Sequence, residues 1–327
     1  MAPPAQPGQQ TPPASVCVLG SCNMDLVVRA PRIPVPGETV LGGSYRTFPG
    51  GKGANQAVAA ARMGAHVSLI ACLGDDAHGQ RLRDAMTPEG MDLSGLRVRE
   101  KEATGLALIT VAEGGENTIV VAPGANASLS PEDVQQSAVL ITGADVLLVQ
   151  LEVPLASVQA AAAIARGAGR CVVLNAAPAR VLPRELLSLV DVLIVNQTEA
   201  MRMLNIDSRL DPARLALRLP ELGLTTVLLT LGSSGAIMAH KGRPKRLSPP
   251  GVRSVDSVGA GDAFCGALAV AWAEVHAAQK RKDHREFELA EHAALVAAAA
   301  GALATTKPGA IPSMPTRADI DSLMATA

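Results

Sequence analysis

Residues 255–264, VDSVGAGDAF, combine two glycines with an acidic residue in front of an apolar stretch. Residues 263–275 are apolar and contain no proline, which predicts a buried helix that begins near Gly261. The first N–H groups of a helix have no partner within it, so a helix start that is reached through Gly259 and Gly261 is an anion site. Asp262 would not bind the anion, but it could accept a proton from a hydroxyl that attacks it. This pattern indicates phosphoryl transfer to a hydroxyl, unless Asp262 only caps the helix and the glycines only turn the chain.

A second glycine-rich segment, residues 49–56 (PGGKGANQ), leads into an alanine-rich stretch that predicts a helix over 54–63. Lys52 lies between glycines and has nothing obvious to pack against, which favours contact with a ligand. The alternative is a tight turn with Asn55 on a solvated first helical turn.

The order of predicted elements indicates an α/β fold. From residue 131 onward, short apolar strands alternate with helices, which is typical of a mostly parallel, doubly wound sheet with helices on both faces. Two hairpin-like regions, near 25–48 and 105–122, interrupt this order and predict a small β-sheet apart from the main body, which would act as a lid. The first of them includes a weak strand over 38–41. We expect one domain over 15–327, preceded by a disordered tail at 1–14.

Polar residues follow several predicted strands at their carboxyl ends, the edge where such sheets bind ligands. Gln150 and Glu152 end one strand, Asn175 ends the next, and residues 230–235 (TLGSSG) follow the last of the series. Glycine and serine in this last loop could offer backbone N–H donors to phosphate. Asn196 and Glu199 could order water on Mg²⁺. The alternative for this pair is a capping box at the start of a helix.

Composition excludes several classes of function. The 327 residues are 48% hydrophobic and carry a formal net charge of −1, so neither nucleic acid nor a membrane is an expected partner. Five cysteines without CxxC spacing indicate core residues in a reducing cytoplasm, and no secretory signal pattern opens the chain. The apolar stretch over 289–306 predicts a packed helix rather than a membrane span. No Walker A, G-x-G-x-x-G, zinc or G-x-S-x-G motif is present.

Taken together, these motifs resemble those of the ribokinase-like (PfkB) family of sugar and nucleoside kinases. Residues 50–57 (GGKGANQA) and 256–264 (DSVGAGDAF) look like its two signatures, and Asn196-x-x-Glu199 looks like its magnesium and phosphate motif. Within the family, segments 20–25, 150–152 and 175–180 resemble members that phosphorylate ribose. The resemblance extends from about residue 16 to the end of the chain.

This resemblance implies ATP-dependent phosphorylation of D-ribose at O5, with Mg²⁺ and with K⁺ as an activator, in a homodimer that pairs through the lid sheets. Asp262 would be the base, and the N–H groups of Gly259, Ala260, Gly261 and Asp262 would form the anion hole. The sugar would be held by Asn23, Met24, Asp25, Gly51, Lys52, Gly53, Ala54, Asn55 and Glu152, beside Asp262. The nucleotide would be held by Asn196, Glu199, Thr230, Leu231, Gly232, Ser233, Ser234 and Gly235, with Gly261 and Asp262. The monovalent cation would lie among Asp256, Val258, Ala304, Lys307, Gly309 and Ser313.

Two alternatives remain open at this stage. One is a kinase of the same family that acts on another pentose, a nucleoside or a sugar acid. The other is a non-catalytic regulator that binds a sugar or a nucleotide, although the presence of Asp262 and both glycines disfavours it.

Overall fold

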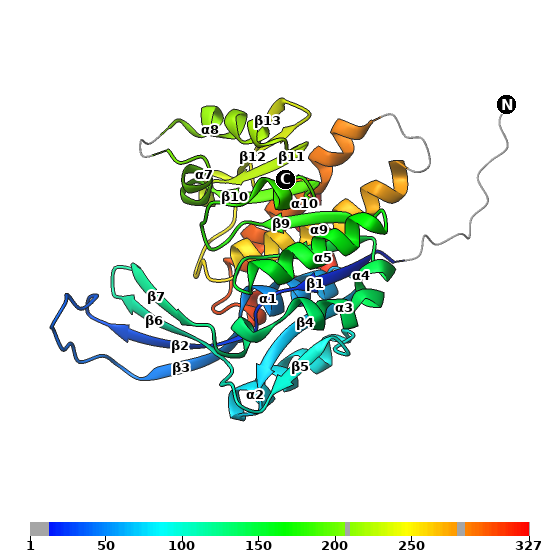
Figure 1. Ribbon diagram of the computed structural model, residues 1–327. Helices are drawn as coiled ribbons and strands as arrows, with labels where there is room; N and C mark the ends of the chain where they lie inside the picture. The colour runs from blue at the N-terminus through cyan, green and yellow to red at the C-terminus, as the bar shows by residue number, and fades with distance from the viewer. Residues whose placement is uncertain (1–12, 207–209, 280–284, 327) are drawn as a thin grey trace, which may run out of the picture.

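The computed structural model describes residues 13–206, 210–279 and 285–326 (Figure 1). The tail predicted over 1–14 lies outside the described residues, apart from its last two positions.

The main body is built on a nine-stranded sheet in the order β13-β12-β11-β10-β9-β8-β1-β4-β5. All neighbouring strands from β5 to β11 in this order pair in parallel, and β12 and β13 add an antiparallel edge. The strands are β1 (Ser15–Leu19), β4 (His66–Gly74), β5 (Leu96–Arg99), β8 (Val146–Val149), β9 (Cys171–Asn175), β10 (Val192–Asn196), β11 (Thr226–Thr230), β12 (Ala236–His240) and β13 (Arg243–Leu247).

Two hydrophobic cores lie on opposite faces of this sheet. In β1, Val16 and Val18 belong to one core, whereas Cys17 and Leu19 belong to the other. Successive side chains of a strand point to opposite faces, so a strand buried on both sides is apolar at every position. This explains why the sequence of the central strands shows continuous apolar runs rather than alternation.

Helices cover both faces, which confirms the predicted doubly wound arrangement (Figure 1). The first face carries α1 (Lys52–Arg62), α2 (Ala77–Met86), α9 (Ala260–Gln279), α10 (Glu286–Ala304) and α11 (Arg317–Ala325). The second face carries α3 (Pro131–Gln136), α4 (Ala138–Gly143), α5 (Leu155–Gly167), α6 (Arg184–Leu187), α7 (Gln197–Met203) and α8 (Pro212–Arg218). Among the described residues, α10 alone is long and apolar enough to cross a membrane by length and composition. It packs against α9, and its alanines from 297 to 300 lie in the core, as expected of a packed helix.

A separate four-stranded sheet, β3-β2-β6-β7, projects from the main body (Figure 1). Its strands are β2 (Asn23–Ala30), β3 (Tyr45–Gly50), β6 (Gly105–Ala112) and β7 (Asn117–Ala122). The two predicted hairpin regions therefore form one sheet, because β2 pairs with β6 in parallel as well as with β3. The strand predicted over 38–41 is wrong, since these residues are irregular. Pro34 and Pro36 stand just before them, and proline offers no N–H for a strand ladder.

The connections of β1 create the place where a ligand binds in folds of this type. From β1 the chain continues to β4 on one side, and it later returns to β8 on the other side. Ligands of open α/β sheets bind outside the carboxyl ends of the strands where the order reverses in this way. The residues that follow β1 and β8 are therefore the ones to examine.

Candidate active site

Side chains from three segments meet at this switch point. Glu152, which follows β8, accepts a hydrogen bond at Oε2 from the Ser21 hydroxyl at 2.5 Å and faces the Asn23 amide nitrogen at 3.5 Å. The backbone nitrogen of Lys52, the first residue of α1, lies 3.5 Å from the same oxygen. The structure thus surrounds the Glu152 carboxylate with residues that precede it by 100 to 131 positions in the sequence.

Gly51 makes this close approach possible. Its φ is +92°, a conformation that residues with a side chain rarely adopt. A Cβ atom added there would also lie 2.5 Å from the backbone nitrogen of Asn23. A glycine is therefore required where the chain enters α1.

Asp25 is a buried carboxylate on β2. Its pKa is raised to about 7, first by burial and then by the nearby carboxylates of Glu152 and Asp262, against the opposing charge of Lys52. Lys52 shows the counterpart of this arrangement. Burial lowers its pKa, but the surrounding carboxylates, with Asp262 foremost and Glu199 among them, bring it above the ordinary value. The Lys52 ammonium group therefore lies among acids predicted to hold the sugar, Glu152 and Asp262, and an acid predicted to hold the nucleotide, Glu199.

Asp262 is the third residue of α9, close to the predicted helix start. Its two oxygens accept hydrogen bonds from α1: Oδ2 from the Asn55 amide at 2.8 Å, and Oδ1 from the Gln56 amide at 2.9 Å. A residue that only caps its own helix needs no such partners. The first-turn N–H groups of α9 lie beside this fixed carboxylate. A site that suits an anion and an acceptor for a proton are therefore next to each other.

The residues predicted for the nucleotide lie at the carboxyl ends of β10 and β11. Asn196 and Glu199 form the capping box that the sequence offered as an alternative: Asn196 Oδ1 accepts from the Glu199 N–H, and Glu199 Oε2 accepts from the Asn196 N–H, each at 2.8 Å. In the loop after β11, the N–H groups of Leu231, Ser234 and Gly235 donate within the loop. These internal bonds limit the donors that the loop can offer to phosphate.

Two further loops meet beside the start of α9. The Asp256 carboxylate accepts a hydrogen bond from the Val258 N–H at 3.0 Å and another from the Gly309 N–H at 2.9 Å. The segments predicted to hold a monovalent cation are thereby joined through one side chain. Arg62, at the end of α1, donates to the carbonyl oxygens of Ile311 and Met314, both at 2.9 Å.

Comparison with known proteins identifies the family. Residues 13–317 match the model of the pfkB family carbohydrate kinases. The chain belongs to this family. A ribokinase of Haemophilus influenzae is 41% identical over 93% of this chain and 96% of its own, and one of Bacillus subtilis is 35% identical over 95% and 99%. The structure of Arabidopsis thaliana ribokinase complexed with ribose and ATP has a TM-score of 0.82 and 32% identity, covering 95% of this chain and 99% of that one.

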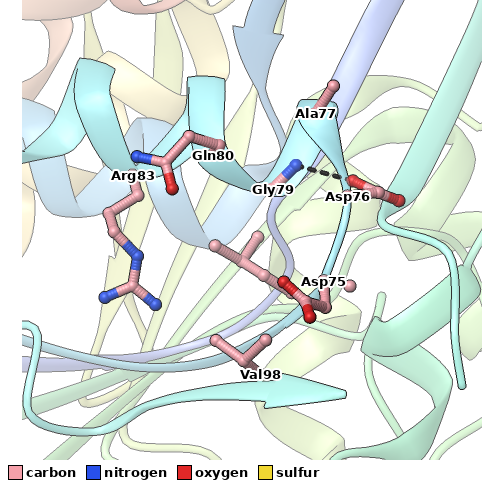
Figure 2. Close-up of a pocket in the computed structure, with 9 residues that line it drawn as sticks. Asp75, Asp76, Ala77, Gly79, Gln80, Arg83 and Val98 are labelled. Carbon is pink, nitrogen blue, oxygen red and sulfur yellow. Dashed lines mark hydrogen bonds between the residues drawn. The ribbon is translucent and has the colours of Figure 1, made fainter. Parts of the chain in front are cut away.

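A cavity of about 510 Å³ lies elsewhere on this pfkB kinase, at the carboxyl end of β4 (Figure 2). Asp75, Gln80, Arg83 and Val98 are among its lining residues, and its lining contains none of the sugar or nucleotide residues predicted from the sequence. Asp76 at its rim caps α2 through the Gly79 N–H at 2.8 Å. Asp76 also accepts from the Thr104 N–H at 2.8 Å and from the Thr104 hydroxyl at 2.7 Å, so its bonds hold a helix start against the loop before β6.

Gln56 is the main residue of the candidate site to which the sequence assigned no role. It is fully buried and contacts Asp262 directly. The available signal was a second amide next to Asn55 at the start of a helix that otherwise consists largely of alanine and valine.

Proposed function

We propose that the protein catalyses the ATP-dependent phosphorylation of D-ribose at O5, which gives D-ribose 5-phosphate and ADP. The observation that carries the proposal is the Asp262 carboxylate, held at the start of α9 by α1, the helix that also bears Lys52 and Asn55. Membership of the carbohydrate kinase family supports it, as do the ribokinases to which the chain is similar.

The sugar site that we propose is acidic. Asp25 and Glu152 would accept hydrogen bonds from hydroxyl groups of the ring, with Asn23 and Asn55 beside them, and the backbone of Met24, Gly51, Gly53 and Ala54 would complete the wall. Two carboxylates suit a neutral polyol and would repel a sugar that is already phosphorylated. The Asn55 Oδ1 atom is buried without a partner among the described residues, so it is free to accept from a hydroxyl.

In the proposed reaction, Asp262 takes the proton from the O5 hydroxyl as that oxygen attacks the γ-phosphoryl group of ATP. The N–H groups of Gly259, Ala260, Gly261 and Asp262 would face the phosphoryl oxygens, and that of Ala260 also donates to the Ser257 carbonyl oxygen at 3.3 Å. Charge spreads over these oxygens in the transition state, so donors that are already fixed stabilise it. The Lys52 ammonium adds positive charge on the same side. When the lid sheet closes, it would exclude the water that otherwise competes as acceptor.

The nucleotide would lie over β10 and β11, against residues 230–235. Magnesium bound with the phosphates would supply positive charge there, and Asn196 and Glu199 would hold its water. The geometry fits this role, because the capping box occupies Glu199 Oε2 and leaves Oε1 for a water. Burial raises the pKa of Glu199, and Lys52 opposes that rise.

We also propose a K⁺ site between the two loops that Asp256 joins, with oxygens drawn from Asp256, Val258, Ala304, Lys307, Gly309 and Ser313. Support comes from the bonds of Asp256, which hold residues 256–258 against Gly309. Oxygen ligands in a loop of this kind suit a hard cation.

The lid sheet is the proposed interface of a homodimer. All six residues of β7 are exposed, and Ile119, Val120 and Leu108 leave 55%, 65% and 48% of their surface open. Exposed apolar side chains gathered on one sheet mark an interaction surface. The proposed compartment is the cytoplasm, because all five cysteines are free thiols in the structure.

The experiment that tests the function is a coupled ADP-release assay of the purified chain with MgATP, with and without K⁺. The acceptors are D-ribose, 2-deoxyribose, fructose, adenosine and 2-keto-3-deoxygluconate. A clear preference for ribose, raised by K⁺, supports the proposal. Preference for another acceptor would contradict the ribose assignment and reassign Asn23, Asp25 and Glu152, while absence of turnover with retained ATP binding would contradict catalysis itself.

A further inference from the structure

Gln56 stands at the centre of a buried network of side-chain amides. Its Nε2 donates to Asp262 Oδ1 at 2.9 Å and to Asn175 Oδ1 at 3.1 Å, and its Oε1 accepts from Gln150 Nε2 at 2.7 Å. Gln56, Gln150 and Asn175 are all buried, and they come from α1, from the end of β8 and from the end of β9. One side chain therefore connects the predicted base to two central strands.

A close helix contact brings Gln56 to Asp262. Gly266 lies four residues after Asp262, on the same face of α9. A Cβ atom at Gly266 would come within 2.6 Å of both the Gln56 carbonyl oxygen and the Ala59 Cβ. Without a side chain at this position, α1 and α9 approach closely enough for a glutamine of one helix to reach a carboxylate of the other.

The network also fixes which end of the Gln56 amide faces Asp262. An amide offers two N–H donors on nitrogen and only acceptor sites on oxygen. In the observed orientation, both donors meet acceptors and the oxygen meets the Gln150 donor. Turning the amide over would place its oxygen against two acceptor oxygens, and its NH₂ group against the NH₂ group of Gln150. The Asp262 carboxylate, which can only accept, therefore sets the nitrogen of Gln56 toward itself, and the bond from Gln150 Nε2 to Gln56 Oε1 supports this orientation.

We propose that Gln56 is a positioning residue of the phosphoryl transfer, which keeps Asp262 turned toward the attacking hydroxyl, and that Gln150 supports the orientation of Gln56. This inference rests on the proposed function of Asp262 as base. An N–H donor stabilises the charged form of a carboxylate, so its loss makes the carboxylate harder to ionise. Hydrogen bonds to both oxygens also keep the carboxylate from rotating, so the lone pair that accepts the proton keeps one direction. Asn55 holds Oδ2 and Gln56 holds Oδ1.

The test compares Gln56→Met and Gln56→Glu with the wild type and with Gln80→Met as a matched control. Gln80 is exposed on α2, where its amide donates to Asp84. Methionine keeps the length of the side chain but removes both donors, so kcat should fall by roughly 10- to 100-fold, the value of a hydrogen bond to a charged group. The KM for ribose should change little, and the acidic limb of the kcat profile should move to higher pH. Glutamate, which adds a like charge, should move this limb further. The control should alter neither.

The pH profile separates positioning from a structural role. Partial misfolding lowers kcat through the fraction of active protein but leaves the acidic limb in place, so a fall in kcat with an unmoved limb overturns the inference. If the wild type phosphorylates ribose and Gln56→Met has the same kcat and the same pH profile, the inference is wrong and the proposed function stands.

A second arm needs no substrate and therefore remains informative if ribose is not the acceptor. Chemical denaturation of wild type, Gln56→Met, Asp262→Asn and the double variant forms a double-mutant cycle. Strongly coupled side chains give non-additive effects on stability. Additive effects would refute the contact on which the inference depends, and non-additive effects would support it.

Discussion

If Asp25 holds ribose as proposed, we expect its buried carboxylate to make ribose affinity depend on pH. Burial and, after it, the charges of Glu152 and Asp262 together raise its pKa to about 7, against the opposing charge of Lys52. Hydroxyl groups donate to the ionised carboxylate, and the protonated form has lost one of its acceptor sites. Below about pH 7 the protonated form predominates in the empty site, so ribose binding should weaken as the pH falls.

The size of the effect follows from simple linkage. If only the ionised form binds ribose, the apparent Kd rises by a factor of about 11 at pH 6 and about 1.1 at pH 8 for a pKa near 7. We therefore expect ribose to bind roughly tenfold more weakly at pH 6 than at pH 8, which corresponds to about 1.4 kcal/mol.

Isothermal titration calorimetry of ribose without nucleotide, from pH 5.5 to 8.5, measures this directly, because no catalytic step takes part. Glu152→Gln removes the nearby charge that raises the Asp25 pKa most. The midpoint of the pH dependence should therefore move to lower pH in this variant, even if binding weakens overall. Asp25→Asn should bind weakly at every pH, without a midpoint. Equal affinities of the wild type at pH 6 and pH 8 would refute the reasoning, and an unmoved midpoint in Glu152→Gln would refute the role given to its charge.

Three further variants test the machinery around α9. Asp262→Asn should lose about 10²- to 10⁴-fold in kcat, the usual contribution of a positioned base, with little change in ribose binding; near wild-type turnover in the ADP-release assay would disprove the assignment. Asp256→Ala removes the acceptor of the Gly309 N–H and should abolish the difference between rates measured in K⁺ and in Na⁺ buffers, whereas a retained K⁺ response would place the cation elsewhere. Gly266→Ala forces α1 and α9 apart, so it should lower the free energy of unfolding, measured with urea, by about 1–3 kcal/mol and reduce kcat. Gly143→Ala is its control, because a Cβ atom there meets open space. If the two alanine variants unfold at the same urea concentration, the helix contact is not tight.

The parts of the fold that the sequence predicted are those set by local pattern. The helix expected near Gly261 begins at Ala260, because a run of apolar residues without proline follows a glycine-rich turn. The two regions expected to form a small sheet do so, since their strands carry β-branched residues and a glycine turn. Their union into one sheet was not predictable. It depends on the parallel pairing of β2 with β6, whose partners Asn23 and Gly105 are far apart in sequence.

The same distinction explains which parts of the candidate site the sequence missed. Asn55 and Gln56 stand side by side at the start of α1, where the sequence placed Asn55 at the sugar by resemblance but gave Gln56 no role. In the structure both face Asp262, because the glycine at 266 sets the distance between two helices. Neither segment contains that information alone. A polar residue within an alanine-rich helix is therefore best interpreted together with the small residue that allows a second helix to approach it. Here Gly266 allows α9 to approach α1, so Gln56 reaches the predicted base Asp262.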